Sequence, residues 1–118
     1  MSDYNYEIIK TAVIKWYEKA LSKLKNKDEI ILSKNGDNVL IIDFDFQNCI
    51  AQLSVTNSQF TPYQFVYFEA LSIGTSNQEE SKLIYCFFDN DTMKKVDVMG
   101  GLDKALAFCS NYKINAQN

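Results

Sequence analysis

Two pairs of aspartates have the residue type and spacing to do carboxylate chemistry. Asp43 and Asp45 come directly after one hydrophobic run, and Asp89 and Asp91 come after another. Carboxylates are candidate acid-base groups and candidate ligands for a divalent metal ion. Asp43 and Asp45 could also form a metal site with Glu69 if a sheet brings their strands together.

The Asp-X-Asp spacing resembles the first motif of haloacid-dehalogenase phosphatases. The resemblance implies that one Asp is a nucleophile and the next an acid or base, around Mg²⁺. That family needs a parallel, doubly wound sheet, a later Lys and a further acidic pair, and this chain does not offer that context. The alternative is that Asp43 and Asp45 lie at a solvated rim of a sheet, while Asp89 and Asp91 end a strand and cap a helix. We favour this alternative and expect no catalytic residue, no metal and no cofactor.

The composition removes the commonest catalytic and nucleic-acid-binding groups. All twelve basic residues are Lys, and fifteen acidic residues bring the net charge to −3. Without His, the usual acid-base group near neutral pH is missing. Without Arg, the preferred ligand for phosphate and guanine is missing. We therefore expect neither an enzyme nor a nucleic-acid-binding protein.

The three cysteines, Cys49, Cys86 and Cys109, lack the paired spacing of a zinc site. We expect them to be buried thiols in a reducing compartment. Acidic Asp3 and Glu7 stand where a secretory signal would be basic, and the longest apolar runs are too short to cross a bilayer. These features predict a cytoplasmic protein that does not contact membranes.

Residues 1–118 have the length of a single domain, and 47% of them are hydrophobic. A helix is predicted over residues 6–24, capped by Ser2 or Asp3, because apolar residues recur there at three- and four-residue steps. This stripe consists of Tyr6, Ile9, Val13, Trp16, Ala20 and Leu24. A second helix is predicted after Asp91 or Thr92, and Gly100-Gly101 indicates a break or a close packing contact within it.

Five strands are predicted between the helices. They cover residues 29–34, 39–46, 49–56, 63–73 and 82–88. Asn35-Gly36 indicates a tight hairpin turn between the first two strands. The fold class is therefore α+β: an N-terminal helix, a five-stranded and mainly antiparallel meander, and a C-terminal helix, in two layers. Because strands four and five are apolar on both faces, we expect some aromatic surface to stay uncovered.

Charge is unevenly distributed along the chain. Residues 1–34 carry seven Lys and five acids, net +2, whereas residues 35–118 carry five Lys and ten acids, net −5. Ordinary solvated faces would explain this, but an acidic surface beside exposed aromatic residues would attract a basic protein. The candidate residues of that surface are Asp43, Asp45, Glu69, Glu79 and Glu80, with Tyr67 and Tyr85 as aromatic anchors.

In size, acidity and helix-sheet-helix order the chain resembles small bacterial immunity proteins, most of all in the segments 50–55 and 60–69. The resemblance implies a non-enzymatic inhibitor that binds a bacterial toxin domain and occludes its active site.

A secretion chaperone or adaptor is the second hypothesis, in which a small acidic protein, commonly a homodimer, binds an effector segment. Type III chaperones place a helix between strands three and four, and residues 57–62 are too few to form one. A small carboxylate-based, metal-dependent enzyme or a ligand-binding protein is the third hypothesis.

Overall fold

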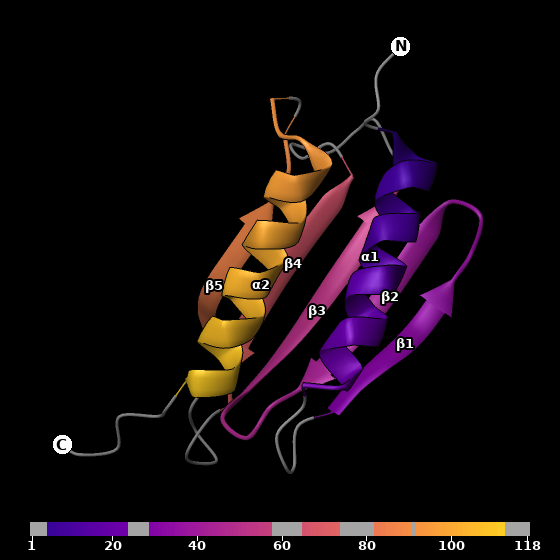
Figure 1. The fold of residues 1–118 in the computed structure, drawn as a ribbon. Helices are drawn as coiled ribbons and strands as arrows, with labels where there is room; N and C mark the ends of the chain where they lie inside the picture. The colour runs from indigo at the N-terminus through magenta and orange to yellow at the C-terminus, as the bar shows by residue number, and fades with distance from the viewer. Residues whose placement is uncertain (1–4, 24–28, 58–64, 74–81, 91, 113–118) are drawn as a thin grey trace, which may run out of the picture.

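The computed structural model describes residues 5–23, 29–57, 65–73, 82–90 and 92–112. The elements in chain order are α1 (Tyr6–Leu21), β1 (Glu29–Asn35), β2 (Val39–Asp45), β3 (Cys49–Thr56), β4 (Val66–Ser72), β5 (Leu83–Phe88) and α2 (Lys95–Asn111). The strands form one sheet in sequential order, and each is antiparallel to the next. Both helices lie on the same face of this sheet (Figure 1). The predicted two-layer α+β meander is confirmed.

Helix α1 forms because its apolar stripe can be buried against the sheet. The predicted stripe residues within the helix are all buried, namely Tyr6, Ile9, Val13, Trp16 and Ala20. The cap is Asn5, whose side-chain oxygen accepts the Ile8 backbone N–H at 3.0 Å and so satisfies one free donor of the first turn. The predicted capping by Ser2 or Asp3 is therefore wrong, and both residues lie outside the described part of the chain.

The sheet begins with the predicted β1–β2 hairpin, and its connection comprises residues 36–38. The Gly36 N–H donates to the Val39 carbonyl at 2.7 Å, and the pairing register shifts between Leu32 and Lys34. Strand β3 has the predicted bounds, and β4 and β5 fall within the predicted segments.

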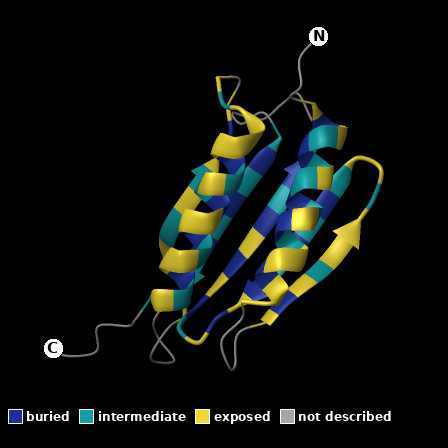
Figure 2. Ribbon diagram, viewed as in Figure 1, coloured by how far each residue is buried: buried dark blue, intermediate teal, exposed yellow. Residues whose placement is uncertain are grey.

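The core lies between the sheet and the two helices, and buried positions alternate with more exposed ones along the central strands (Figure 2). Aromatic rings connect the layers: the Phe44 ring lies 6.1 Å from that of Trp16 and 5.5 Å from that of Phe68, between centroids. Leu40, Ile42 and Phe44 are buried, as the strand pattern predicts.

Helix α2 begins later than predicted. Lys94 is its N-cap residue, and the Asp97 carboxylate accepts the Lys94 backbone N–H at 2.9 Å. Thr92 instead donates its backbone N–H and its hydroxyl to the Asn90 side chain, at 2.9 and 2.6 Å. The prediction that Thr92 caps the helix is wrong, and Asp91 lies outside the described residues.

The predicted close contact in α2 is found at Gly101. A Cβ atom at this position would lie 2.3 Å from Cζ of Phe87, whereas one at Gly100 would have no neighbour within 4 Å. Gly101 therefore lets α2 pack closely against β5.

Asp89 follows β5 and is fully buried, and its carboxylate accepts the backbone N–H groups of Phe65 and Val66, each at 2.9 Å. Two charge-assisted hydrogen bonds thus fix the start of β4 next to the end of β5. The expectation that Asp89 ends a strand is confirmed, and the carboxylate has a structural role there.

The cysteine prediction needs one correction. Cys49 and Cys109 are buried free thiols between sheet and α2, but Cys86 is exposed. Both faces of β5 carry apolar residues, so the sequence pattern does not tell which face is covered by the helices. The pairing with β4 determines that Cys86 points away from them.

Candidate protein-binding face

The face of the sheet away from the helices is covered by neither α1 nor α2 (Figure 1). We call this surface the open face. Cross-strand pairing arranges its residues in three rows: Ile31, Asp43, Gln52, Glu69 and Cys86; Asp45, Ile50, Leu71 and Leu83; and Ile41, Ser54, Tyr67 and Phe88. Each row crosses most of the sheet, so side chains from distant parts of the sequence become neighbours.

Large apolar side chains are exposed on the open face. The exposed fractions are 54% for Ile31, 42% for Ile50, 55% for Leu83 and 43% for Phe88. A single exposed apolar residue is ordinary on a protein surface, but several on one flat sheet face form a patch of the kind that binds another molecule. The uncovered apolar and aromatic surface expected from strands four and five is present on this face.

Acidic side chains stand among these apolar residues. The Asp43 carboxylate accepts hydrogen bonds from the Ser33 hydroxyl and, at 2.9 Å, from Nε2 of Gln52. The Tyr67 hydroxyl donates to Oε1 of Glu69 at 3.0 Å. These contacts restrict the two carboxylates to defined positions. This lowers the entropy cost when the carboxylates bind a positively charged group of a partner.

A shallow depression of about 440 Å³ lies at the centre of the open face. Its lining combines the apolar side chains of Ile31, Ile50 and Leu71 with the carboxylates of Asp45 and Glu69. Such a lining suits a Lys or Arg side chain, whose aliphatic stem packs on apolar surface while its charged end meets a carboxylate.

Four of the five predicted partner-binding residues share this face. Asp43, Asp45, Tyr67 and Glu69 lie within a few positions of one another in its three rows. The sequence reasoning did not identify the exposed isoleucines and leucines between them, since alternation alone does not tell which apolar face of a strand is covered.

Tyr85 lies on the other face of the sheet. It pairs with buried Ala70, and its ring centroid is 6.2 Å from that of Phe68 and 4.8 Å from that of Phe108 on α2. Tyr85 therefore packs between β5 and α2 and is separated from the other four predicted residues. Glu79 and Glu80, which were also expected in the acidic surface, lie outside the described residues.

The described carboxylates of the open face do not form a metal-ligand cluster. Among the residues that the structure describes, no three or more His, Cys, Asp or Glu side chains are grouped so as to hold an ion. Asp43, Asp45 and Glu69 are all within this part of the chain, so their shared face does not make them a metal-ligand set.

Comparison with known proteins gives no match. No protein-family model, no curated protein and no solved structure is significantly similar to the chain. Neither described helix is long and apolar enough to span a bilayer. Function must therefore be inferred from the surfaces of the molecule itself.

Proposed function

We propose that this protein is a cytoplasmic inhibitor of the immunity type, which binds a basic bacterial toxin domain through the open face and occludes the toxin's active site. The observation that carries the proposal is the combination on one uncovered sheet face of exposed Ile31, Ile50 and Phe88 with the carboxylates of Asp43 and Glu69. No catalytic group is required for this role.

The open face has the composition of a binding surface. Burial of its apolar side chains supplies affinity, while its carboxylates speed association with a positively charged partner and fix its orientation. The five strands are six to eight residues long. At a spacing of about 4.8 Å and a rise of about 3.4 Å per residue, they cover about 460 Å² in projection. A stable interface buries about 800 Å² per partner. The open face can thus form the centre of such an interface, and neighbouring loops would complete it.

A secretion adaptor or homodimer remains the second proposal because β5 is an edge strand. Its exposed Leu83 and Phe88 flank backbone groups that have no strand neighbour on that side within the described sheet. An extended segment of another chain, or β5 of a second copy, could pair with this edge. Measuring the native mass of the purified protein distinguishes a dimer from a monomer.

The direct test replaces both open-face aspartates of β2 with lysine, as Asp43→Lys with Asp45→Lys. A matched control, Glu18→Lys with Asp37→Lys, alters two exposed acids on α1 and in the hairpin turn. Both variants change the net charge from −3 to +1, because each Asp→Lys or Glu→Lys replacement adds two positive charges. Only position on the molecule distinguishes them.

The protein would first be isolated, tagged, from its native host, and the co-purifying protein identified by mass spectrometry. We expect a stoichiometric, basic partner whose toxicity is suppressed by the protein. Calorimetry with that partner should show affinity at least about tenfold weaker for the open-face variant than for the control. Equal affinity of the two variants would place the interface elsewhere, and a host extract that yields only free protein would favour a small ligand or an enzymatic role.

A further inference from the structure

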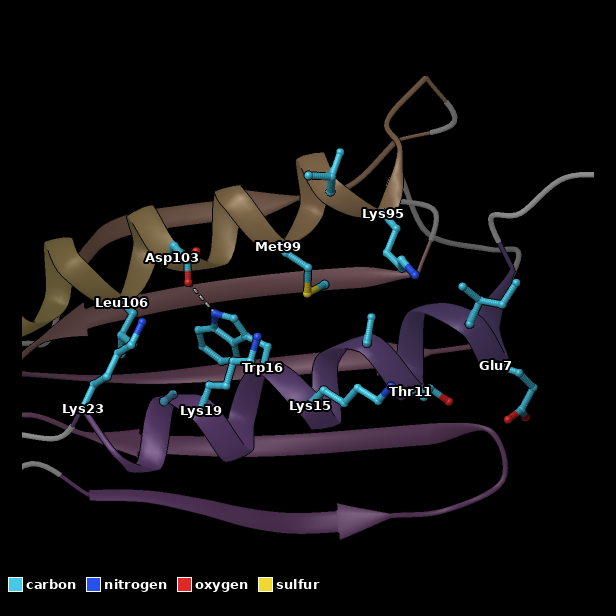
Figure 3. Close-up of a pocket in the computed structure, with 14 residues that line it drawn as sticks. Glu7, Thr11, Lys15, Trp16, Lys19, Lys23, Lys95, Met99, Asp103 and Leu106 are labelled. Carbon is cyan, nitrogen blue, oxygen red and sulfur yellow. Dashed lines mark hydrogen bonds between the residues drawn. The ribbon is translucent and has the colours of Figure 1, made fainter.

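A second recessed surface lies on the opposite side of the molecule, between the two helices. Helices α1 and α2 run side by side over the sheet (Figure 1), and a groove of about 770 Å³ separates their facing sides (Figure 3). The apolar residues that line it are Ile8, Ala12, Trp16, Ala20, Val96, Met99 and Leu106. This groove is almost twice as large as the depression on the open face.

Trp16 is central to the groove and connects its two walls. Its side chain is 6% exposed, and its indole Nε1–H donates to Oδ1 of Asp103 on α2 at 2.8 Å (Figure 3). The hydrogen bond is a direct side-chain contact between the two helices. It also engages the Asp103 carboxylate, which with Glu7 is one of two acidic side chains among the described residues that line the groove.

Lysines dominate the charged lining. Lys15 and Lys19 on α1 and Lys23 just beyond its end follow one another at four-residue intervals, and Lys95 extends from the first turn of α2. Four residues correspond to slightly more than one turn and about 6 Å of rise along a helix, so Lys15 and Lys19 lie on one side of α1, and Lys23 follows that side past the helix end. Within the described lining, the four lysines exceed the two acids and leave a net charge of +2.

We propose that the groove binds an acidic amphipathic helix of another polypeptide. Carboxylates spaced four residues apart on such a helix advance by the same 6 Å as the lysine row, so several ion pairs could form together. The apolar side of the same helix would cover the exposed Val96 and the half-buried Met99 and Leu106, in the helix-in-groove mode of recognition. A single-headed lipid would engage one lysine of the row, and a bilayer surface would not enter a concave groove.

This inference is independent of the proposed function. The groove lies on the helix face of the sheet and the open face on the other, so neither site contains a residue of the other. The charge of the expected ligand is also opposite at the two sites.

The chain carries its own reporter for the test, because Trp16 is its only tryptophan. The probe is a synthetic helix of Leu, Ala and Glu, about fifteen residues long, with Glu at four-residue intervals and Leu on the opposite side. A scrambled peptide of the same composition and a peptide with Lys in place of Glu are the controls. None of the three peptides contains an aromatic residue, so tryptophan emission reports on Trp16 alone.

We expect a saturable change in Trp16 emission with the ordered acidic peptide and none with the two control peptides. Lys15→Glu with Lys19→Glu should weaken this binding at least about tenfold. The control Lys34→Glu with Lys104→Glu changes the net charge equally at exposed lysines that do not line the groove, and it should bind nearly as the unaltered protein does.

Three results would overturn the proposal: no binding of the ordered acidic peptide, equal binding of the scrambled peptide, or equal weakening by the two pairs of substitutions. Emission changes with phosphatidylglycerol vesicles or with laurate, in the absence of peptide binding, would instead assign the groove to an anionic lipid. Because Lys15 and Lys19 are exposed, the substituted protein should keep its circular dichroism spectrum, and Lys15→Gln with Lys19→Gln provides a milder second variant.

Discussion

The adjacent glycines of α2 offer a sharp test of how this helix packs on the sheet. Gly100 and Gly101 are adjacent in the same helix, but a Cβ atom added to Gly100 meets no atom within 4 Å, whereas one added to Gly101 would lie 2.3 Å from the Phe87 ring. Alanine at each position therefore has the same effect on the helix backbone and a different effect on packing.

The expected magnitudes follow from two terms. Replacing a helical glycine with alanine stabilises a helix by about 1 kcal/mol, and Gly100→Ala should gain this amount. Gly101→Ala gains the same amount but forces the Phe87 ring to move, and overpacking of this kind costs about 1–3 kcal/mol. Its net effect should range from no change to a loss of about 2 kcal/mol, so the two variants should differ by about 1–3 kcal/mol.

The assay is urea denaturation followed by circular dichroism and by emission of Trp16. A third variant, Phe87→Leu, and its combination with Gly101→Ala complete a double-mutant cycle, in which the smaller side chain should relieve part of the cost. If Gly101→Ala proved as stable as Gly100→Ala, or if the cycle showed no coupling with Phe87, α2 would not pack on β5 as described.

Two further predictions concern buried titratable groups. Burial raises the pKa of Tyr6, and its hydroxyl has no hydrogen-bond partner among the described residues, so Tyr6→Phe should be about as stable as the unaltered protein at pH 7 or up to about 1 kcal/mol more stable. Below the ordinary tyrosine pKa near 10, the raised pKa of Tyr6 makes its full contribution to the stability of the folded state. This contribution is lost as the pH rises through the raised pKa of the folded state. The unaltered protein should therefore lose more stability above about pH 10 than Tyr6→Phe, and parallel stability curves would contradict this. The hydrogen bond with Cys49, together with burial, raises the pKa of the Cys109 thiol far above its ordinary value, whereas Cys86 is exposed. Ellman's reagent at pH 8 should label one thiol in the native protein and three in denaturant, and rapid labelling of more than one native thiol would be inconsistent with the buried pair.

Most of the fold could be predicted because its elements have unambiguous periodicity. The α1 stripe recurs at helical spacing from Tyr6 to Ala20, and β3 alternates between buried side chains and exposed or half-buried ones. The start of α2 was predicted poorly because Asp91 and Thr92 are residue types that favour helix caps. In the folded protein, Thr92 donates hydrogen bonds to the Asn90 side chain, and the Asp97 carboxylate accepts the Lys94 N–H in the first turn of the helix. Which of these polar residues caps the helix depends on local backbone geometry, which the residue types do not reveal.

The candidate site was predicted only in part, and β5 shows why. Alternation establishes that Tyr85 and Phe87 share one face of the strand and that Cys86 and Phe88 share the other, but both faces are apolar. Which face meets the helices depends on the register with β4 and on the register shift after Ala70. Tyr85 was consequently grouped with surface residues although α2 covers it.

The groove was missed for a different reason: a row of lysines on a helix ordinarily indicates nothing more than a solvated face. It becomes a candidate site only when the second helix is placed beside it, since α2 is distant in sequence and supplies Lys95, Met99 and Leu106. Helix-helix distances of this kind are set by the sheet that both helices cover.

The two proposed surfaces have opposite charge and lie on opposite sides of a two-layer fold, which bears on how they interact. A layer of helices packs about 10 Å from its sheet, so the lysines of the groove rim and the open-face carboxylates are separated by more than this distance. Electrostatic interactions are screened over about 8 Å at physiological ionic strength and over about 30 Å at 0.01 M. Charge reversal of Asp43 and Asp45 should thus leave binding in the groove unchanged at physiological salt and alter it only at low salt. A basic partner and an acidic helix could then occupy the protein together without competing.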